Sequence, residues 1–189
     1  GVKYDRFKKP YYFNFFENSF LKKADFVSIP FQDLVHSFNK KYHDKFIVIP
    51  QGFNFSEIKL SKSAFKNEVP TMIFAGTVMP GIRDPLGLID FLIENKEPFK
   101  IIIYTRQNSL FKKYNNNKAI ILKDYVMRLN LLEEMSKADF LINVNIDKND
   151  NSSLDAIPSK LIDYALTGRP ILSYEQNSFN KNKVKEFLK

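Results

Sequence analysis

The feature that most constrains the fold is a series of short apolar runs alternating with helical segments across residues 71–189. Each run is short, continuous and apolar, as is typical of strands that are covered on both faces of a sheet. The alternation predicts a doubly wound α/β domain around a parallel sheet of about five strands. The strands are expected at TMIFA (71–75), FKIIIY (99–104), AIILK (119–123), FLINV (140–144) and PILSY (170–174), and the helices at 85–95, 109–114, 129–137, 159–167 and 183–188.

A smaller α/β segment precedes this domain. Apolar spacing predicts helices over 11–23 and 31–41, and short apolar runs predict strands over 26–30 and 46–50. The residues that follow are polar and weakly periodic, which is typical of a linker. The predicted organisation is therefore a segment over 1–55, a linker over 56–70 and a larger domain over 71–189.

Composition excludes several kinds of site. The 189 residues are 44% hydrophobic and 15% aromatic, which is enough to build a core. The chain has no cysteine, so disulfides, thiolate metal sites and cysteine nucleophiles are excluded, and its two histidines argue against a histidine metal site. No apolar run approaches the roughly 18–20 residues of a membrane span. The N-terminus lacks the apolar core of a secretory signal, and its first residue, Gly1, suggests a piece of a longer protein or a tag remnant.

The net charge of +8 comes mainly from scattered lysines. Scattering is typical of a solvated surface, and mild attraction to anionic ligands or to a membrane surface is the alternative. Phe13, Phe16 and Phe20 share one face of the first predicted helix, which indicates packing. Because lysines flank that helix, membrane-surface contact is the alternative there too. Nucleic-acid binding is disfavoured, since no basic stripe or known binding motif is present.

In a parallel sheet, ligands bind beyond the carboxyl ends of the strands. The candidate loops therefore follow the first four strands of the larger domain. In the first loop, Gly76 allows close backbone approach and Arg83 is suited to a forked contact with a diphosphate; an ordinary turn with a surface arginine is the alternative. In the third loop, Tyr125 is placed to stack on a base or, alternatively, to cover the core. The loops span 76–84, 105–108, 124–128 and 145–160.

The segment DAIPSKLIDYALTGRP carries the densest set of candidate residues. A helix that starts at Pro158 and Ser159 presents unpaired backbone N–H groups, and Lys160 adds a cation in its first turn. Asp155 and Asp163 are suited to accept hydrogen bonds from sugar and ribose hydroxyls, or are surface carboxylates that bracket the helix start. The pattern predicts a site for a sugar nucleotide.

Three stretches resemble the retaining glycosyltransferases of the GT-B fold, in particular family 4, the glycosyl transferases group 1 type. Residues 24–54 resemble the end of that family's N-terminal acceptor domain. TMIFAGTVMPGIRDPLGLIDFL resembles the first strand and phosphate loop of the donor domain, and IPSKLIDYALTGRPIL resembles the donor-site helix and the strand after it. The resemblance implies a Rossmann-like domain that binds a nucleotide sugar.

The resemblance also implies roles for individual residues. Asp155 and Asp163 take the places of the family's paired glutamates, with Asp155 at the sugar and Asp163 at the ribose. Arg83 and Lys160 lie where the family contacts the diphosphate, and helix start and cations together neutralise the leaving group without a metal. The predicted catalytic residues are thus Asp155, Arg83 and Lys160, and the predicted substrate-binding residues are Gly76, Thr77, Tyr125, Val126, Pro158, Ser159 and Asp163.

The chain departs from the family pattern at three points. Both glutamates are aspartates, whose reach is shorter by one methylene. The arginine that often follows the first-loop glycine is replaced by Thr77, for which Lys160 is the hypothesised compensation. Only the end of the acceptor domain is matched, so we expect no turnover from this chain alone.

The predicted function is the donor-binding part of a glycosyltransferase, specifically a hexosyltransferase. It would transfer a sugar from a nucleotide sugar to a glycan or lipid-linked acceptor in polysaccharide biosynthesis, with retention and without metal or cofactor. The expected location is cytoplasmic, peripheral at the inner membrane face. The alternative is a non-catalytic nucleotide-binding or interaction module of the same fold.

Overall fold

The computed structural model describes residues 11–50, 52, 67–96, 98–145, 159–176 and 179–187. The chain divides into two compact units. The described part of the first unit comprises α1 (Tyr11–Lys23), β1 (Val27–Ile29), η1 (Gln32–Ser37), η2 (Lys40–Lys45) and β2 (Phe46–Val48). Within the described residues, no helix is both long and apolar enough to cross a membrane.

In the first unit, β1 and β2 pair in parallel as a two-stranded sheet. The Nζ of Lys45 donates to the carbonyls of Leu21 at 3.0 Å and Ala24 at 2.7 Å, so a cation satisfies the C-terminal end of α1. The prediction of one helix over 31–41 is wrong. Two 3₁₀ segments replace it, because Asn39 is extended and its side chain instead accepts the backbone N–H of Lys41.

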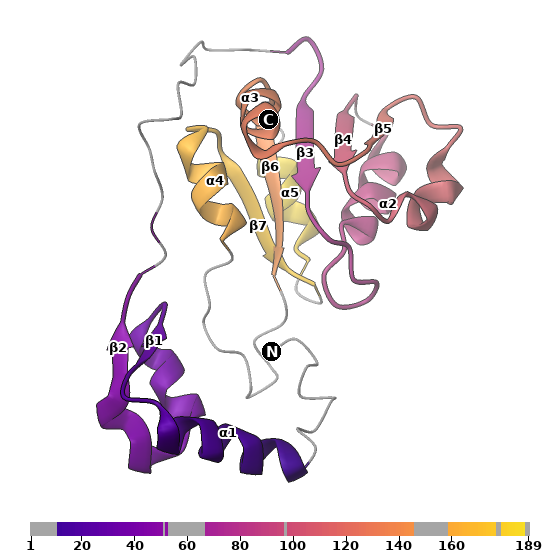
Figure 1. Ribbon diagram of the computed structural model, residues 1–189. Helices are drawn as coiled ribbons and strands as arrows, with labels where there is room; N and C mark the ends of the chain where they lie inside the picture. The colour runs from indigo at the N-terminus through magenta and orange to yellow at the C-terminus, as the bar shows by residue number, and fades with distance from the viewer. Residues whose placement is uncertain are drawn as a thin grey trace. The chain divides into compact units, whose positions relative to one another are not determined.

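The second unit has the predicted doubly wound α/β fold. Its five strands are all parallel, in the order β5-β4-β3-β6-β7, with helices on both sides (Figure 1). Every strand expected between 71 and 174 is present, with no end shifted by more than one residue. The elements are β3 (Thr71–Ala75), α2 (Leu86–Asn95), β4 (Lys100–Tyr104), η4 (Asn108–Tyr114), β5 (Ile120–Lys123), α3 (Arg128–Ser136), β6 (Phe140–Asn145), α4 (Lys160–Leu166), β7 (Ile171–Glu175) and α5 (Lys181–Phe187).

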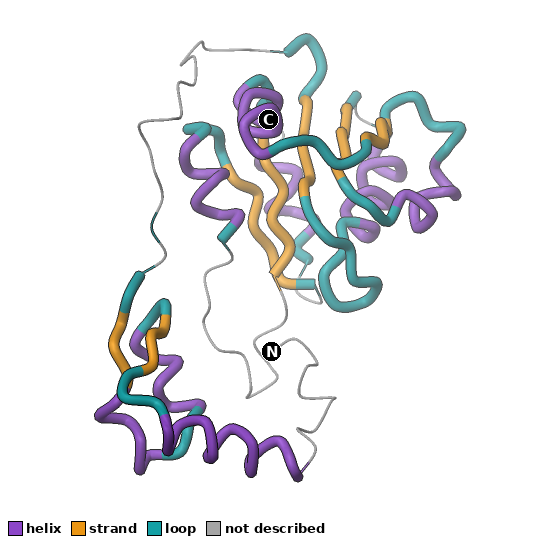
Figure 2. Tube along the Cα trace, in the orientation of Figure 1, coloured by secondary structure: helices purple, strands orange, loops and turns teal. Residues whose placement is uncertain are grey.

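The two faces of this sheet carry separate apolar clusters. Helices α2, η4 and α5 cover one face, where Phe74 and Ile103 are fully buried. Helices α3 and α4 cover the other, where Ile73, Leu141 and Tyr164 are buried. Figure 2 shows the strands running between the two helical layers. Because side chains alternate along each strand, β3 supplies both clusters, and this explains its uninterrupted apolar sequence.

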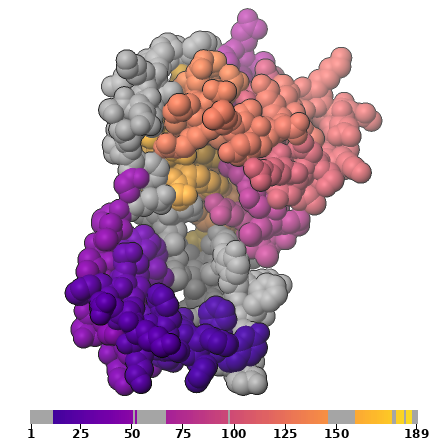
Figure 3. Space-filling view, in the orientation of Figure 1, coloured from indigo at the N-terminus to yellow at the C-terminus, as the bar shows by residue number. Residues whose placement is uncertain are grey.

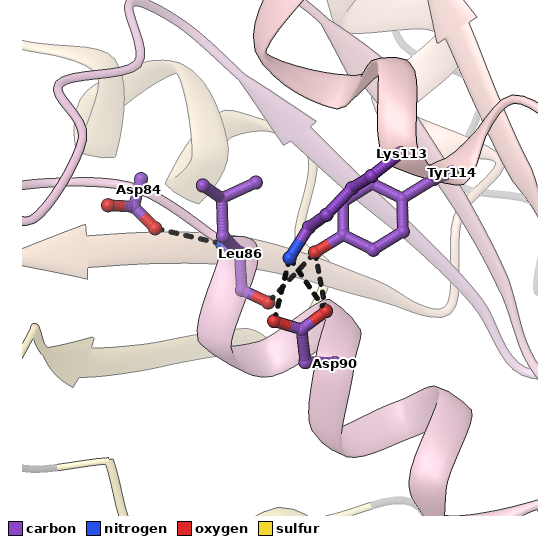
Figure 4. A network of polar contacts seen from close by, with 5 residues as sticks. All are labelled: Asp84, Leu86, Asp90, Lys113 and Tyr114. Carbon is purple, nitrogen blue, oxygen red and sulfur yellow. Dashed lines mark hydrogen bonds and ion pairs between the residues drawn. The ribbon is translucent and has the colours of Figure 1, made fainter.

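The loop between β3 and α2 is fastened by a buried carboxylate. Asp84 accepts the backbone N–H of Leu86 at 3.0 Å through Oδ1 and so satisfies a donor at the start of α2, although Pro85 occupies the cap position itself (Figure 4). Its Oδ2 accepts the N–H of Gly81, and its own N–H donates to the amide oxygen of Gln176 at 2.9 Å. Farther along α2, Asp90 accepts hydrogen bonds from Lys113 and Tyr114, which ties the helix to η4 (Figure 4).

We expect Asp84→Ala to lower the free energy of unfolding by about 1–2 kcal/mol, because the hydrogen bonds from the helix start at Leu86 and from the loop at Gly81 are lost together. Urea denaturation measures this loss. The matched control is Glu94→Ala, at the exposed C-terminal end of the same helix, where a change within about 0.5 kcal/mol is expected. Equal stability of the two variants would contradict the stabilising role of the Asp84 carboxylate.

Candidate functional site

A cavity of about 310 Å³ opens at the carboxyl ends of the central strands. Its floor is apolar, and its rim carries hydroxyl, amide and charged groups. All four segments that topology singled out contribute to it, the last of them through Lys160 at the start of α4, and α3 contributes as well. The lining residues are Ala75, Gly76, Thr77, Tyr104, Thr105, Arg106, Gln107, Tyr125, Val126, Leu131, Met135, Lys160, Asp163 and Tyr164.

The cavity lies where the sheet reverses its strand order. Strand β3 pairs with β4 as far as Ala75, but its pairing with β6 ends at Phe74 and Ile142. The Tyr164 hydroxyl, from α4, takes the place of the missing ladder. It accepts the N–H of Ala75 at 3.2 Å and lies 3.1 Å from the carbonyl of Ile142, to which it can donate. This side chain is 1% exposed, and burial raises its pKa to about 12, so the phenol stays protonated.

The first loop is held open against the end of β4. Gly76 has φ +139°, a backbone conformation that favours glycine, and its N–H donates to the carbonyl of Tyr104 at 3.0 Å. The amide oxygen of Gln107 accepts the N–H of Val78 at 3.3 Å and the hydroxyl of Thr105 at 2.7 Å. Hydrogen bonds within the protein therefore hold the backbone of the loop at Gly76 and Val78.

A lysine lines the cavity, and an arginine lies near that lysine. Lys160 lines it, and its Nζ lies over the rings of Phe74 and Tyr164, 5.3 and 5.7 Å from their centroids. Burial and then the charge of Arg83 lower the pKa of the Lys160 ammonium to about 7. Burial likewise lowers the pKa of Arg83. In the described part of the chain, no carboxylate forms an ion pair with either side chain. Such a pair is suited to an anion that relieves the repulsion between them.

A carboxylate and an aromatic group complete the rim. Asp163 lines the cavity and is held by Arg128, with 2.6 Å between Nη2 and Oδ1. Tyr125 is exposed, and the Arg106 guanidinium lies 4.6 Å from its ring centroid. A flat aromatic with a cation stacked on it offers a surface to a nucleobase.

The predicted site residues fall into three groups. Six of them line one cavity, namely Gly76, Thr77, Tyr125, Val126, Lys160 and Asp163. Arg83 lies close enough to Lys160 to affect its pKa, while Ser159 is exposed outside the lining at the start of α4. Asp155 and Pro158 lie outside the described residues. The chemical roles of these residues stay predictions.

Sequence reasoning missed Arg106, Gln107 and Arg128. The first two stand in the loop 105–108, which topology had marked as a ligand loop, so their position was available and only their contacts were hidden. Arg128 gave a weak signal, since a cation at a helix start is unusual.

The seven-residue helix α4 is also shorter than predicted, so the cations provide a stronger case for an anion than the helix dipole does.

Comparisons with known proteins give a structural likeness. The search against protein-family models and the search of curated proteins found no match. Among solved structures, the chain is similar to the one titled "Crystal Structure of TarM", with a TM-score of 0.61 and 14% sequence identity. The likeness covers 91% of this chain and 38% of TarM. It shows the fold, a Rossmann-like α/β domain of the GT-B kind.

The lowered pKa of Lys160 predicts that the free energy of unfolding depends on pH. Between a folded pKa of about 7 and the ordinary lysine value, the unfolded chain holds a proton that the folded chain has released. This group therefore makes the free energy of unfolding rise with pH across that window. We expect Lys160→Met to remove this rise and to be more stable than the parent at pH values below about 7. Urea denaturation over a pH series measures both effects.

The control for this experiment is Lys118→Met, which removes an exposed lysine in the same unit. It is expected to keep the parent's dependence on pH. A Lys160→Met variant with an unaltered pH profile would show that the folded protein does not disfavour the charge on Lys160.

Proposed function

We propose that this chain is the donor-binding part of a glycosyltransferase. The observation that carries the proposal is the Lys160–Arg83 pair beside a cavity at the point where the sheet reverses its order. The pair is suited to two linked phosphates, and the Tyr125–Arg106 stack at the rim is suited to a base. Similarity to TarM, a GT-B glycosyltransferase, supports the same reading.

The reaction we propose breaks the bond between the sugar's anomeric carbon and the diphosphate, and joins that carbon to an acceptor hydroxyl oxygen. The acceptor hydroxyl gives its proton to solvent water, and the diphosphate leaves with the electron pair of the broken bond, so negative charge grows on it. Lys160 and Arg83 stabilise that charge electrostatically, in a partly buried setting where such contacts are stronger than in water. Membership of family 4, retention of configuration and metal independence belong to the proposal through the resemblance.

The remaining roles follow from position. Asp163 would accept hydrogen bonds from the ribose, and the backbone at Gly76 and Thr77 would approach the phosphates. Tyr125 and Val126 would meet the base. As the sequence predicts, the donor sugar would be a hexose that Asp155 contacts. The acceptor would be a glycan or a lipid-linked molecule.

The alternative is a nucleotide-binding module without transferase activity. The ion pair between Asp163 and Arg128, together with threonine in place of arginine at position 77, favours it. Binding of a nucleotide without consumption of any nucleotide sugar, in the presence of candidate glycan and lipid acceptors, would support this alternative.

We expect the chain to bind at least one of UDP, GDP and ADP in isothermal titration calorimetry. Lys160→Ala and Arg83→Ala should each weaken that binding at least about tenfold, because a charge-assisted contact to phosphate is lost. Affinity should also fall as the pH rises above about 7, since Lys160 is then more often neutral. The control Lys118→Ala removes an exposed lysine outside the cavity. Equal affinity in all four proteins would remove the assigned site.

We also propose that α1 contacts a membrane surface, where an acceptor attached to lipid would be found. The helix, indigo in Figure 3, exposes a set of aromatic side chains, with Phe15 72% and Phe16 65% exposed, and ends on exposed Lys22 and Lys23. An aromatic face beside lysines is suited to an anionic lipid interface. The set comprises Tyr12, Phe13, Phe15, Phe16 and Phe20.

Flotation with lipid vesicles tests this contact. The chain should rise with vesicles that contain phosphatidylglycerol and much less with pure phosphatidylcholine, and Phe15→Ser with Phe16→Ser should abolish the association. Because both side chains are exposed, the double variant should keep its thermal midpoint. Flotation that is unaffected by this double change would assign the contact elsewhere.

A further inference from the structure

Helix α3 begins with a cation, at the end where helices ordinarily carry acids. Arg128 is its first residue, and the first turn holds no acidic side chain. The N-terminus of a helix carries a partial positive charge, so a guanidinium placed there is unfavourable unless another group compensates. The compensating group comes from another helix.

That group is Asp163 of α4, 35 positions along the chain. The Nε and Nη2 of Arg128 lie 3.0 and 2.6 Å from the same carboxylate oxygen, Oδ1. Among the described residues, none donates a hydrogen bond to Oδ2. The Asp163 side chain is 22% exposed and lines the cavity, whereas Arg128 is not part of the lining. One carboxylate oxygen is thus held from outside the cavity, and the other keeps its capacity to accept hydrogen bonds.

We infer that Arg128 is a positioning residue, which fixes Asp163 as the acceptor for ribose hydroxyls and so makes the cavity selective for ribonucleotides over 2′-deoxyribonucleotides. This inference rests on the proposed function. A carboxylate that is held in one orientation and half-buried loses a hydrogen bond when the hydroxyl is missing, and such a site discriminates strongly. The pairing also neutralises a negative charge that would otherwise repel a diphosphate bound to Lys160 and Arg83.

The alternative is that the ion pair only joins α3 to α4. The two roles differ in their effect on the ratio of two dissociation constants, those of the ribose and the deoxyribose form of one nucleotide. A structural role affects every ligand alike, whereas a positioning role changes the ratio of affinities for ribose and deoxyribose forms of one nucleotide. A loss of charge near the phosphates cancels in this ratio as well, because both forms carry the same diphosphate.

The experiment measures dissociation constants by calorimetry for UDP, GDP and ADP and for the 2′-deoxy form of the tightest binder. The parent should bind the ribose form about tenfold more tightly than the deoxy form. Arg128→Gln should reduce this preference to about threefold or less, and Arg128→Lys should restore part of it, since lysine keeps the charge but not the fork. Lys118→Gln, an exposed change of equal charge, should leave the preference unchanged.

A double-mutant cycle isolates the path of the effect. Asp163→Asn should lose the preference, and adding Arg128→Gln to it should change the ratio no further, because Arg128 acts through Asp163. Thermal midpoints of all variants identify any that fail to fold. If Arg128→Gln fails to fold, the ratio of affinities in Arg128→Lys is compared with that of the parent instead.

Three results would overturn the inference while leaving the proposed function standing. They are an equal affinity of the parent for both sugars, an unchanged ratio in Arg128→Gln, and an effect of Arg128→Gln that persists in the Asp163→Asn background. Failure of the parent to bind any of the three diphosphates would overturn the proposed function and, with it, this inference.

Discussion

The candidate site depends on one hydroxyl group, that of Tyr164. Where β3 and β6 separate, the N–H of Ala75 has lost its strand partner, and the phenol supplies a replacement inside the core. A buried N–H without a partner is costly, so this contact fixes both the rotation and the depth of α4 against the sheet. Lys160, one turn earlier on the same helix, then lies beside the cavity, and Asp163 lies at its rim.

The same geometry explains why no carboxylate among the described residues pairs with Lys160 or Arg83. The floor of the cavity is formed by side chains that already belong to the core, including Tyr104, Leu131 and Met135. Such surroundings favour neutral groups, so a charge at Lys160 is maintained at a cost to stability. A protein keeps such a cost where binding requires it, and a phosphate is the ligand that would remove it.

Much of the fold was predictable, because periodicity and turn chemistry are local. Uninterrupted apolar runs predicted the five parallel strands. The prediction of one helix over 31–41 was wrong because the Asn39 side chain accepts the backbone N–H of Lys41. Such a side-chain hydrogen bond competes with the helix, and apolar spacing does not reveal it. For the site, spacing and topology indicated which loops would meet. They did not predict that Arg128 would pair with Asp163 or that Arg106 would stack on Tyr125.

The sequence by itself determined the class of fold and the edge of the sheet at which a ligand would bind, since both follow from the order of strands and helices along the chain. Only the tertiary structure decided the electrostatics. The lowered pKa of Lys160 requires burial and a neighbouring Arg83, and the orientation of Asp163 requires Arg128 from another helix. These effects depend on distances between residues far apart in sequence, which become fixed only when the helices pack on the sheet.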